Sequence, residues 1–192
     1  MIIERVAQLL EKCDTEDKHF PPTDLYNEGW MLRLVLDWFS STRDLEHDLN
    51  CPEDGGWYSE ALLPSVFLAR YRGDNLAESW THADGVIGQF LIGEKGEGDL
   101  SLPSGALHFV VIEAKMFSKL SAGVTNAKYY NQAARNVACI VEVIRRADIS
   151  PNLFNNTAFF VIAPESRIDE RVFSKYMERE SINDVVKRRI SE

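Results

Sequence analysis

Apolar residues recur at two spacings along the chain, and each spacing predicts a different kind of element. Apolar positions three or four residues apart predict amphipathic helices, at residues 2–12, 25–39, 124–147 and 168–190. Loose alternation or a short continuous apolar run predicts strands instead, at residues 80–93, 106–115 and 157–163. Helices and strands therefore alternate along the second half of the chain, which is typical of an α/β protein.

Proline, glycine and charged residues separate these segments. Pro21 and Pro22 stop the first helix, and Asp24 is the expected N-cap of the second. A proline interrupts residues 58–72, for which we expect a short helix followed by an extended piece. The glycine-rich stretch 94–99 predicts a hairpin connection, so the strands on either side of it should pair antiparallel.

The order of the elements predicts the sheet. A strand, a long helix and another strand in succession imply a right-handed crossover and a parallel pair. Added to the antiparallel hairpin, this gives a mixed central sheet flanked by helices, in the α/β class. A chain of 192 residues has the length of one domain. We expect residues 1–192 to form it, with a core at about 24–163 and a helix appended at each end.

The composition is that of an ordinary soluble domain, with 45% hydrophobic and 27% charged residues. No apolar run approaches the roughly 18 residues that a membrane helix needs, and Glu4 and Arg5 lie where a signal peptide would be apolar. The three cysteines are far apart and form no CxxC pair, which argues against a disulfide framework or a thiolate zinc site. We therefore expect a cytoplasmic protein without membrane contact.

The net charge of −9 is distributed unevenly. Residues 1–60 hold 14 acidic and 5 basic residues, whereas residues 111–192 hold 10 acidic and 13 basic ones. This asymmetry is a weak indication that the C-terminal part faces a polyanion. A solvated acidic face explains the same numbers equally well.

The strand sequence HFVVIEAK ends in an acid and a base. Glu113 follows an apolar run, and Lys115 comes two positions later. Side chains at i and i+2 of a strand point to the same face, and α/β sheets place ligands at the carboxyl ends of their strands. By itself the pair is most simply a surface ion pair, because the ExK tripeptide is common.

A second acid is expected beside this pair. Asp84, in the sequence HADGVIG, leads into the preceding strand, and a hairpin brings it next to Glu113. Two adjacent carboxylates repel each other unless a cation lies between them, and oxygen ligands suit Mg²⁺ or Mn²⁺ rather than zinc. Such an ion polarises a phosphodiester and activates water, while Lys115 can orient that water or offset developing charge. Asp99 is the rival of Asp84, but it lies in a charged loop that would hold a metal less firmly.

The motifs DGVIG (84–88) and HFVVIEAK (108–115) resemble the core of the PD-(D/E)XK nuclease superfamily, which has the restriction-endonuclease-like fold. That family has the core order αβββαβ, and the resemblance covers about residues 24–163. Ala83 stands where the family name has proline. The resemblance implies a Mg²⁺- or Mn²⁺-dependent nuclease that hydrolyses phosphodiester bonds in DNA. Its implied metal ligands are Asp84, Glu113 and the backbone carbonyl of Ala114.

The resemblance also implies two site residues on helices. Gln132, in KYYNQAARN, lies in the helix after the motif, where a site-facing glutamine is implied. Glu28, in YNEGWMLRL, corresponds to the acid of the first helix, and Glu60 is the competing candidate. Each has a simpler interpretation, because amides are ordinary on helix surfaces and acids are favoured near helix N-termini.

Several basic and aromatic residues could contact nucleic acid. Lys119, Lys128 and Arg135 follow the Glu113 strand and can meet a phosphate backbone. Tyr129 and Tyr130 can stack on bases, although core packing is the more ordinary role.

Two functions of different classes follow from these residues. The first is a metal-dependent DNA nuclease, with RNA or a small phosphodiester as the other substrates. The second is a catalytically inactive nuclease-fold module that acts in binding or assembly. The acidic N-terminal third favours the second, because a free-standing DNA enzyme usually carries a stronger basic surface. A homodimer or a DNA-targeting partner protein would supply that surface.

Overall fold

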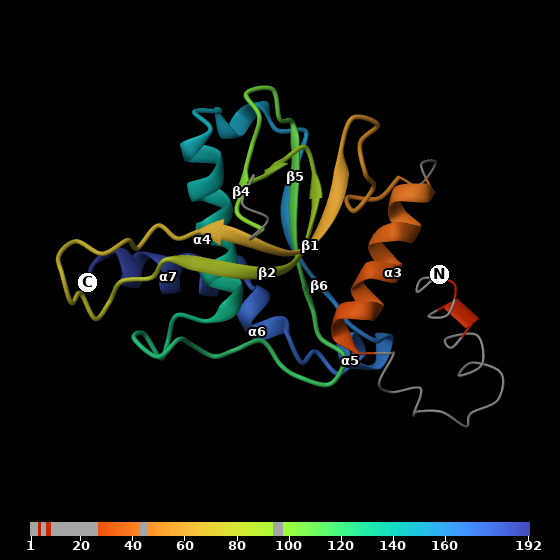
Figure 1. The fold of residues 1–192 in the computed structure, drawn as a ribbon. Coiled ribbons are helices and arrows are strands. Elements are labelled where there is room, and N and C mark those ends of the chain that lie inside the picture. The colour runs from red at the N-terminus through yellow and green to blue at the C-terminus, as the bar shows by residue number, and fades with distance from the viewer. Residues whose placement is uncertain (1–3, 5–6, 9–26, 43–45, 94–97) are drawn as a thin grey trace.

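The centre of the computed structural model is a four-stranded sheet with the order β1-β2-β5-β6 (Figure 1). The structure describes residues 4, 7–8, 27–42, 46–93 and 98–192. The sheet strands are β1 (Gly56–Pro64), β2 (Trp80–Gly88), β5 (His108–Ala114) and β6 (Asn156–Ile162). A small second sheet pairs β3 (Leu91–Ile92) with β4 (Leu100–Ser101). The helices are α3 (Glu28–Ser41), α4 (Gln132–Arg146), α5 (Glu165–Asp169), α6 (Ser174–Met177) and α7 (Arg179–Ile190), with a 3-10 turn at Pro151–Leu153.

The strand directions confirm the predicted mixed sheet. β1 pairs with β2 and β2 with β5 in antiparallel fashion, whereas β5 and β6 are parallel. Helix α4 makes the crossover between the two parallel strands. The result is a mixed α/β sheet flanked by helices.

The sheet is buried on both faces because α3 covers one and α4 the other (Figure 1). Alternate residues of β5 therefore enter different clusters. Val110 and Ile112 pack on the α3 side, and Phe109 and Val111 pack on the α4 side. This two-sided burial explains why β5 is a continuous apolar run and not an alternating one.

Gly85 allows α3 to approach the sheet closely. A Cβ atom at this position would lie 3.0 Å from side-chain atoms of both Leu32 and Leu36. These two leucines are fully buried on the inner side of α3. The absence of a side chain at position 85 therefore leaves room for these two leucines of α3 to pack directly on β2.

Three predicted elements are wrong in kind or extent. The strand predicted at 80–93 ends at Gly88 as β2, and Leu91–Ile92 forms β3, which pairs with β4 in the second sheet. Residues 56–64 form the edge strand β1 where a short helix was expected, because pairing with β2 along most of its length outweighs the ambiguous local pattern. Pro64 is the last residue of this edge strand, so the missing backbone N–H of proline costs the sheet little hydrogen bonding. The predicted tail helix at 168–190 is divided into the short helices α5 and α6 and the longer α7.

Helix boundaries also differ from those predicted. Helix α4 begins at Gln132 and not at residue 124, because the side chain of Asn131 accepts a hydrogen bond from the Ala134 N–H and caps the helix there. Helix α3 is capped in the same way by Asn27. The expected cap, Asp24, lies outside the described residues, as does most of the predicted helix at 2–12.

No helix within the described ranges is long and apolar enough to span a membrane.

Candidate active site

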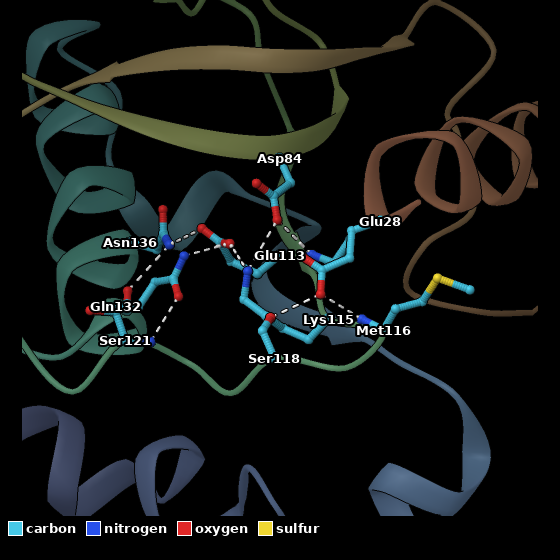
Figure 2. A network of polar contacts seen from close by, with 10 residues as sticks. Glu28, Asp84, Glu113, Lys115, Met116, Ser118, Ser121, Gln132 and Asn136 are labelled. Atoms are coloured by element: carbon cyan, nitrogen blue, oxygen red, sulfur yellow. Dashed lines mark hydrogen bonds and ion pairs between the residues drawn. The ribbon is translucent and has the colours of Figure 1, made fainter. Parts of the chain in front are cut away.

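Asp84 and Glu113 come from neighbouring strands and meet at the end of β5 (Figure 2). The β2–β5 register pairs Gly85 with Ile112, so Asp84 and Glu113 occupy the next position, across from each other. The Asp84 carboxylate accepts a hydrogen bond from the Ala114 N–H at 2.8 Å. This bond fixes one oxygen of Asp84 against the backbone of β5.

Lys115 joins the two carboxylates. Its ammonium Nζ lies 3.1 Å from Glu113 Oε2 and 3.5 Å from Asp84 Oδ2 (Figure 2). Burial alone would lower the pKa of Lys115, but the nearby carboxylates of Glu113 and Asp84 outweigh burial and raise it. Lys115 is therefore an ammonium at neutral pH.

Glu113 is a fully buried carboxyl group, with 0% of the residue exposed. Burial, followed by the charge of Asp84, raises the pKa of Glu113 to about 7, against the opposing effects of Lys115 and Asn136. Burial and the nearby Asp84 carboxylate therefore make Glu113 resist ionisation at neutral pH.

Two amides of α4 hold the Glu113 carboxylate (Figure 2). Gln132 Nε2 donates to Glu113 Oε2 at 2.6 Å, and Asn136 Nδ2 donates to Glu113 Oε1 at 2.8 Å. The sequence did not indicate Asn136 as a site residue. The usable signal was its i+4 spacing from Gln132, which places both amides on one face of the helix.

Gln132 also fixes the loop between β5 and α4. Its Oε1 accepts a hydrogen bond from the Ser121 N–H at 3.1 Å, and its backbone N–H donates to the Ser121 carbonyl at 2.9 Å. The loop is therefore held at Ser121 against the first residue of α4.

Glu28 anchors the near end of the same loop. One oxygen, Oε1, accepts hydrogen bonds from the Met116 N–H and from the Ser118 hydroxyl, each at 2.8 Å (Figure 2). The charge of Glu28 also contributes to the raised pKa of Lys115. Its competitor Glu60 is exposed on β1 and takes no part in the hydrogen bonds of this network.

The other candidates lie elsewhere. Asp99 stands before β4, where its carbonyl accepts a hydrogen bond from the Gly93 N–H. Tyr130 is buried and packs edge-on against Phe67, so it is a core residue. The Tyr129 ring lies 3.6 Å from the guanidinium carbon of Arg188 on α7.

The donor set fits a hard divalent cation. The described site offers carboxylate oxygens from Asp84 and Glu113, which already converge on the positive charge of Lys115. Across the described part of the chain, no group of three or more His, Cys, Asp or Glu residues is placed to hold a metal. A metal at this position would therefore need water or backbone oxygens as further ligands. The structure gives the Ala114 N–H a partner in Asp84, and a metal-binding role for its carbonyl stays a prediction.

A large apolar hollow lies away from this network. It has a volume of about 830 Å³ between α4 and β6, and none of the five predicted site side chains lines it. Its wall is mainly aliphatic, which suits packing and not phosphodiester chemistry. The polar network, and not the hollow, defines the candidate active site.

Comparisons with protein-family models, with curated proteins and with solved structures found no match to this chain. The functional argument therefore depends on the residues and their geometry.

Proposed function

We propose that the protein is a divalent-metal-dependent nuclease of the PD-(D/E)XK type that hydrolyses phosphodiester bonds in DNA. One observation carries the proposal. Asp84 and Glu113, on paired strands, converge on Lys115 Nζ at 3.5 Å and 3.1 Å. This arrangement corresponds to the Asp and ExK motifs from which the resemblance was inferred.

Asp84 and Glu113 would hold the metal ion, with the Ala114 carbonyl as a third ligand. When bound, Mg²⁺ or Mn²⁺ supplies a Lewis acid that polarises the phosphodiester and lowers the pKa of water. The raised pKa of Glu113 supports this assignment, since a divalent cation would allow both carboxylates to ionise together.

The residues around the carboxylates have distinct tasks in this proposal. Lys115, as an ammonium, orients the attacking water and offsets the negative charge that develops on the phosphate. Gln132 and Asn136 fix the plane of the Glu113 carboxylate through its two oxygens. Glu28 fixes the backbone that follows Lys115.

The charge of the surface after β5 supports a polyanionic substrate. Lys119 and Lys128 are exposed in the β5–α4 loop, and Arg135 is partly exposed on the first turn of α4. These residues follow Lys115 in the loop and in the first turn of α4, in the part of the chain with more bases than acids. Cations near a cleavage site favour binding of a phosphate backbone.

The test is cleavage of plasmid, linear duplex and single-stranded DNA, and of RNA, with Mg²⁺, Mn²⁺ or EDTA. We expect metal-dependent cleavage by the wild type and loss of at least about 100-fold in Lys115→Ala and Glu113→Gln, because the effects of charge stabilisation in hydrolysis are of this order. Glu60→Gln is the matched control, since it removes an exposed acid outside the network. Cleavage that survives in the double variant Glu113→Ala/Lys115→Ala would exclude this site as its source.

The inactive-module alternative, which the acidic N-terminal third already favours, gains one structural observation. The Lys115 ammonium already lies between the two carboxylates and neutralises part of their charge. Titration calorimetry with Mn²⁺ separates the two functions, because an intact metal site binds the ion and a purely structural ion triad does not. Absence of binding to the wild type would favour a module used in binding or assembly.

A further inference from the structure

Phe117 is an exposed aromatic residue beside the candidate active site. It is 80% exposed, more than any other large hydrophobic residue in the described ranges. It follows Lys115 by two positions, so their Cα atoms are at most about 7 Å apart. Leaving a phenylalanine ring in water forgoes the stabilisation that its burial would give.

The exposure of Phe117 is not a consequence of a loosely held backbone. Glu28 accepts hydrogen bonds from the residues on both sides, the Met116 N–H and the Ser118 hydroxyl (Figure 2). From the opposite element, α5, the Arg167 guanidinium donates to the carbonyl of Phe117 at 3.0 Å and to that of Ser118 at 2.9 Å. Two elements distant in sequence therefore fix the backbone that presents this ring to solvent.

The immediate neighbours of Phe117, Met116 and Ser118, are uncharged and donate hydrogen bonds to the Glu28 carboxylate, but three cations lie slightly further away. Lys115 precedes it, Lys119 follows it on the surface, and the Arg167 guanidinium contacts its carbonyl. A polyanion drawn to these charges would bring its bases near the ring. The ring offers a flat apolar face, which is what a nucleobase stacks upon.

We propose that Phe117 is a stacking platform for an unpaired base next to the phosphodiester that is cut. This inference depends on the proposed nuclease function and specifies its substrate as single-stranded DNA, or the unpaired part of a DNA molecule. Bases inside a duplex already stack on both faces, so they leave no face for Phe117. A base in a single strand is free to turn onto the ring, and the fixed backbone reduces the entropy lost in binding.

The experiment measures binding of a fluorescein-labelled single strand and of a blunt duplex of the same sequence, by anisotropy with Ca²⁺ in place of Mg²⁺. The variants are Phe117→Ala, Phe117→Leu and Phe117→Trp. Tyr71→Ala is the matched control, because Tyr71 is 63% exposed and belongs to the connection between β1 and β2. Figure 1 shows this connection on the side of the sheet away from α3 and α5. A strand carrying 2-aminopurine reports stacking directly, since its fluorescence is quenched on an aromatic ring.

We expect single-strand binding to weaken about 10-fold in Phe117→Ala and Phe117→Leu, which is within the usual effect of removing one stacked base contact. Phe117→Trp should keep the affinity and the quenching, and Tyr71→Ala should match the wild type. Leucine separates stacking from general apolar contact, because it is apolar but has no π face. Unchanged thermal melting of the variants would show that the exposed ring does not support the fold.

Three results would overturn the inference. Equal single-strand binding by wild type and Phe117→Ala excludes stacking while leaving nuclease activity intact. An equal loss on single strand and duplex means that Phe117 supports the site in general and does not read unpaired bases. Absence of binding and of cleavage by the wild type on every substrate removes the proposed function and the inference together.

Discussion

Asn136 donates a hydrogen bond to Glu113 from a fully buried position on α4, with Asn136 Nδ2 2.8 Å from Glu113 Oε1. The same amide nitrogen lies 3.2 Å from the Gln132 carbonyl, and the other amide atom, Asn136 Oδ1, has no hydrogen-bond partner. Asn136 therefore loses part of its hydrogen bonding by being buried. The bond to Glu113 is the feature that accounts for its position.

Replacing Asn136 by alanine should destabilise the fold. The variant leaves Glu113 Oε1 buried without this donor, and loss of a partner for a buried charged group costs about 1–3 kcal/mol. Urea denaturation at pH 8, where Glu113 is ionised, measures the effect. Asn152→Ala is the control, because Asn152 is exposed in the 3-10 turn. A free energy of unfolding equal to that of the wild type would show that Glu113 does not depend on Asn136.

The pH dependence of stability should report the buried Glu113. Its pKa in the folded protein is about 7, against 4.5 for an ordinary glutamate. Between pH 4.5 and pH 7 the folded state therefore holds a proton on Glu113 that the unfolded state has lost. Stability therefore falls as pH rises from about 4.5 to 7, by at most about 3 kcal/mol. His108 acts in the opposite direction. Burial lowers its pKa, so the stability that the neutral imidazole contributes is lost as pH falls.

The measurement is the difference in unfolding free energy between wild type and Glu113→Gln, followed from pH 5 to pH 8. Taking the difference removes His108, which both proteins retain. We expect the wild type to lose stability relative to the variant as pH rises. A constant difference would contradict a raised pKa for Glu113.

Strand patterns predicted that Asp84, Glu113 and Lys115 would meet, and the resemblance to the nuclease superfamily added Gln132 and Glu28. The apolar run of β5 and the crossover through α4 predicted the sheet around Glu113. The structure brings Asp84, Lys115, Gln132 and Glu28 into one network with it. Their catalytic and metal-binding roles stay predictions, since contacts alone do not establish chemistry.

The parts that sequence patterns missed depend on tertiary contacts. Asn136 is a polar residue on an amphipathic helix, and no periodicity distinguishes a buried amide from an exposed one. Strand β1 contains Glu60 with a positive φ of 63° and ends at Pro64, so its local pattern is weak for a strand. These residues form a strand because they pair with β2, and the local sequence pattern does not indicate that pairing.

Metal binding should release a proton. At pH 7 Glu113 is about half protonated, given its pKa of about 7, and a divalent cation on both carboxylates would displace that proton. Calorimetry with Mn²⁺ in PIPES and in Tris buffer measures the release, because the two buffers take up protons with different enthalpies. We expect about half a proton per ion at pH 7, estimated from this pKa, and less at pH 8. Binding enthalpies that are equal in the two buffers would place the ion elsewhere.

Gly85→Ala should weaken the fold and the candidate site together. The added Cβ atom would lie 3.0 Å from the ends of the buried Leu32 and Leu36 side chains, and we expect α3 to shift slightly away from the sheet to relieve these contacts. Overpacking of this kind costs about 1–3 kcal/mol, and the shift moves Glu28, which anchors the loop after Lys115. Gly105→Ala is the control, because a Cβ atom there meets nothing within 4 Å. We expect Gly85→Ala to lower both the midpoint of urea unfolding and the affinity for Mn²⁺ at a temperature where it is still folded. Reduced stability with unchanged Mn²⁺ affinity would show that the site does not depend on the position of α3.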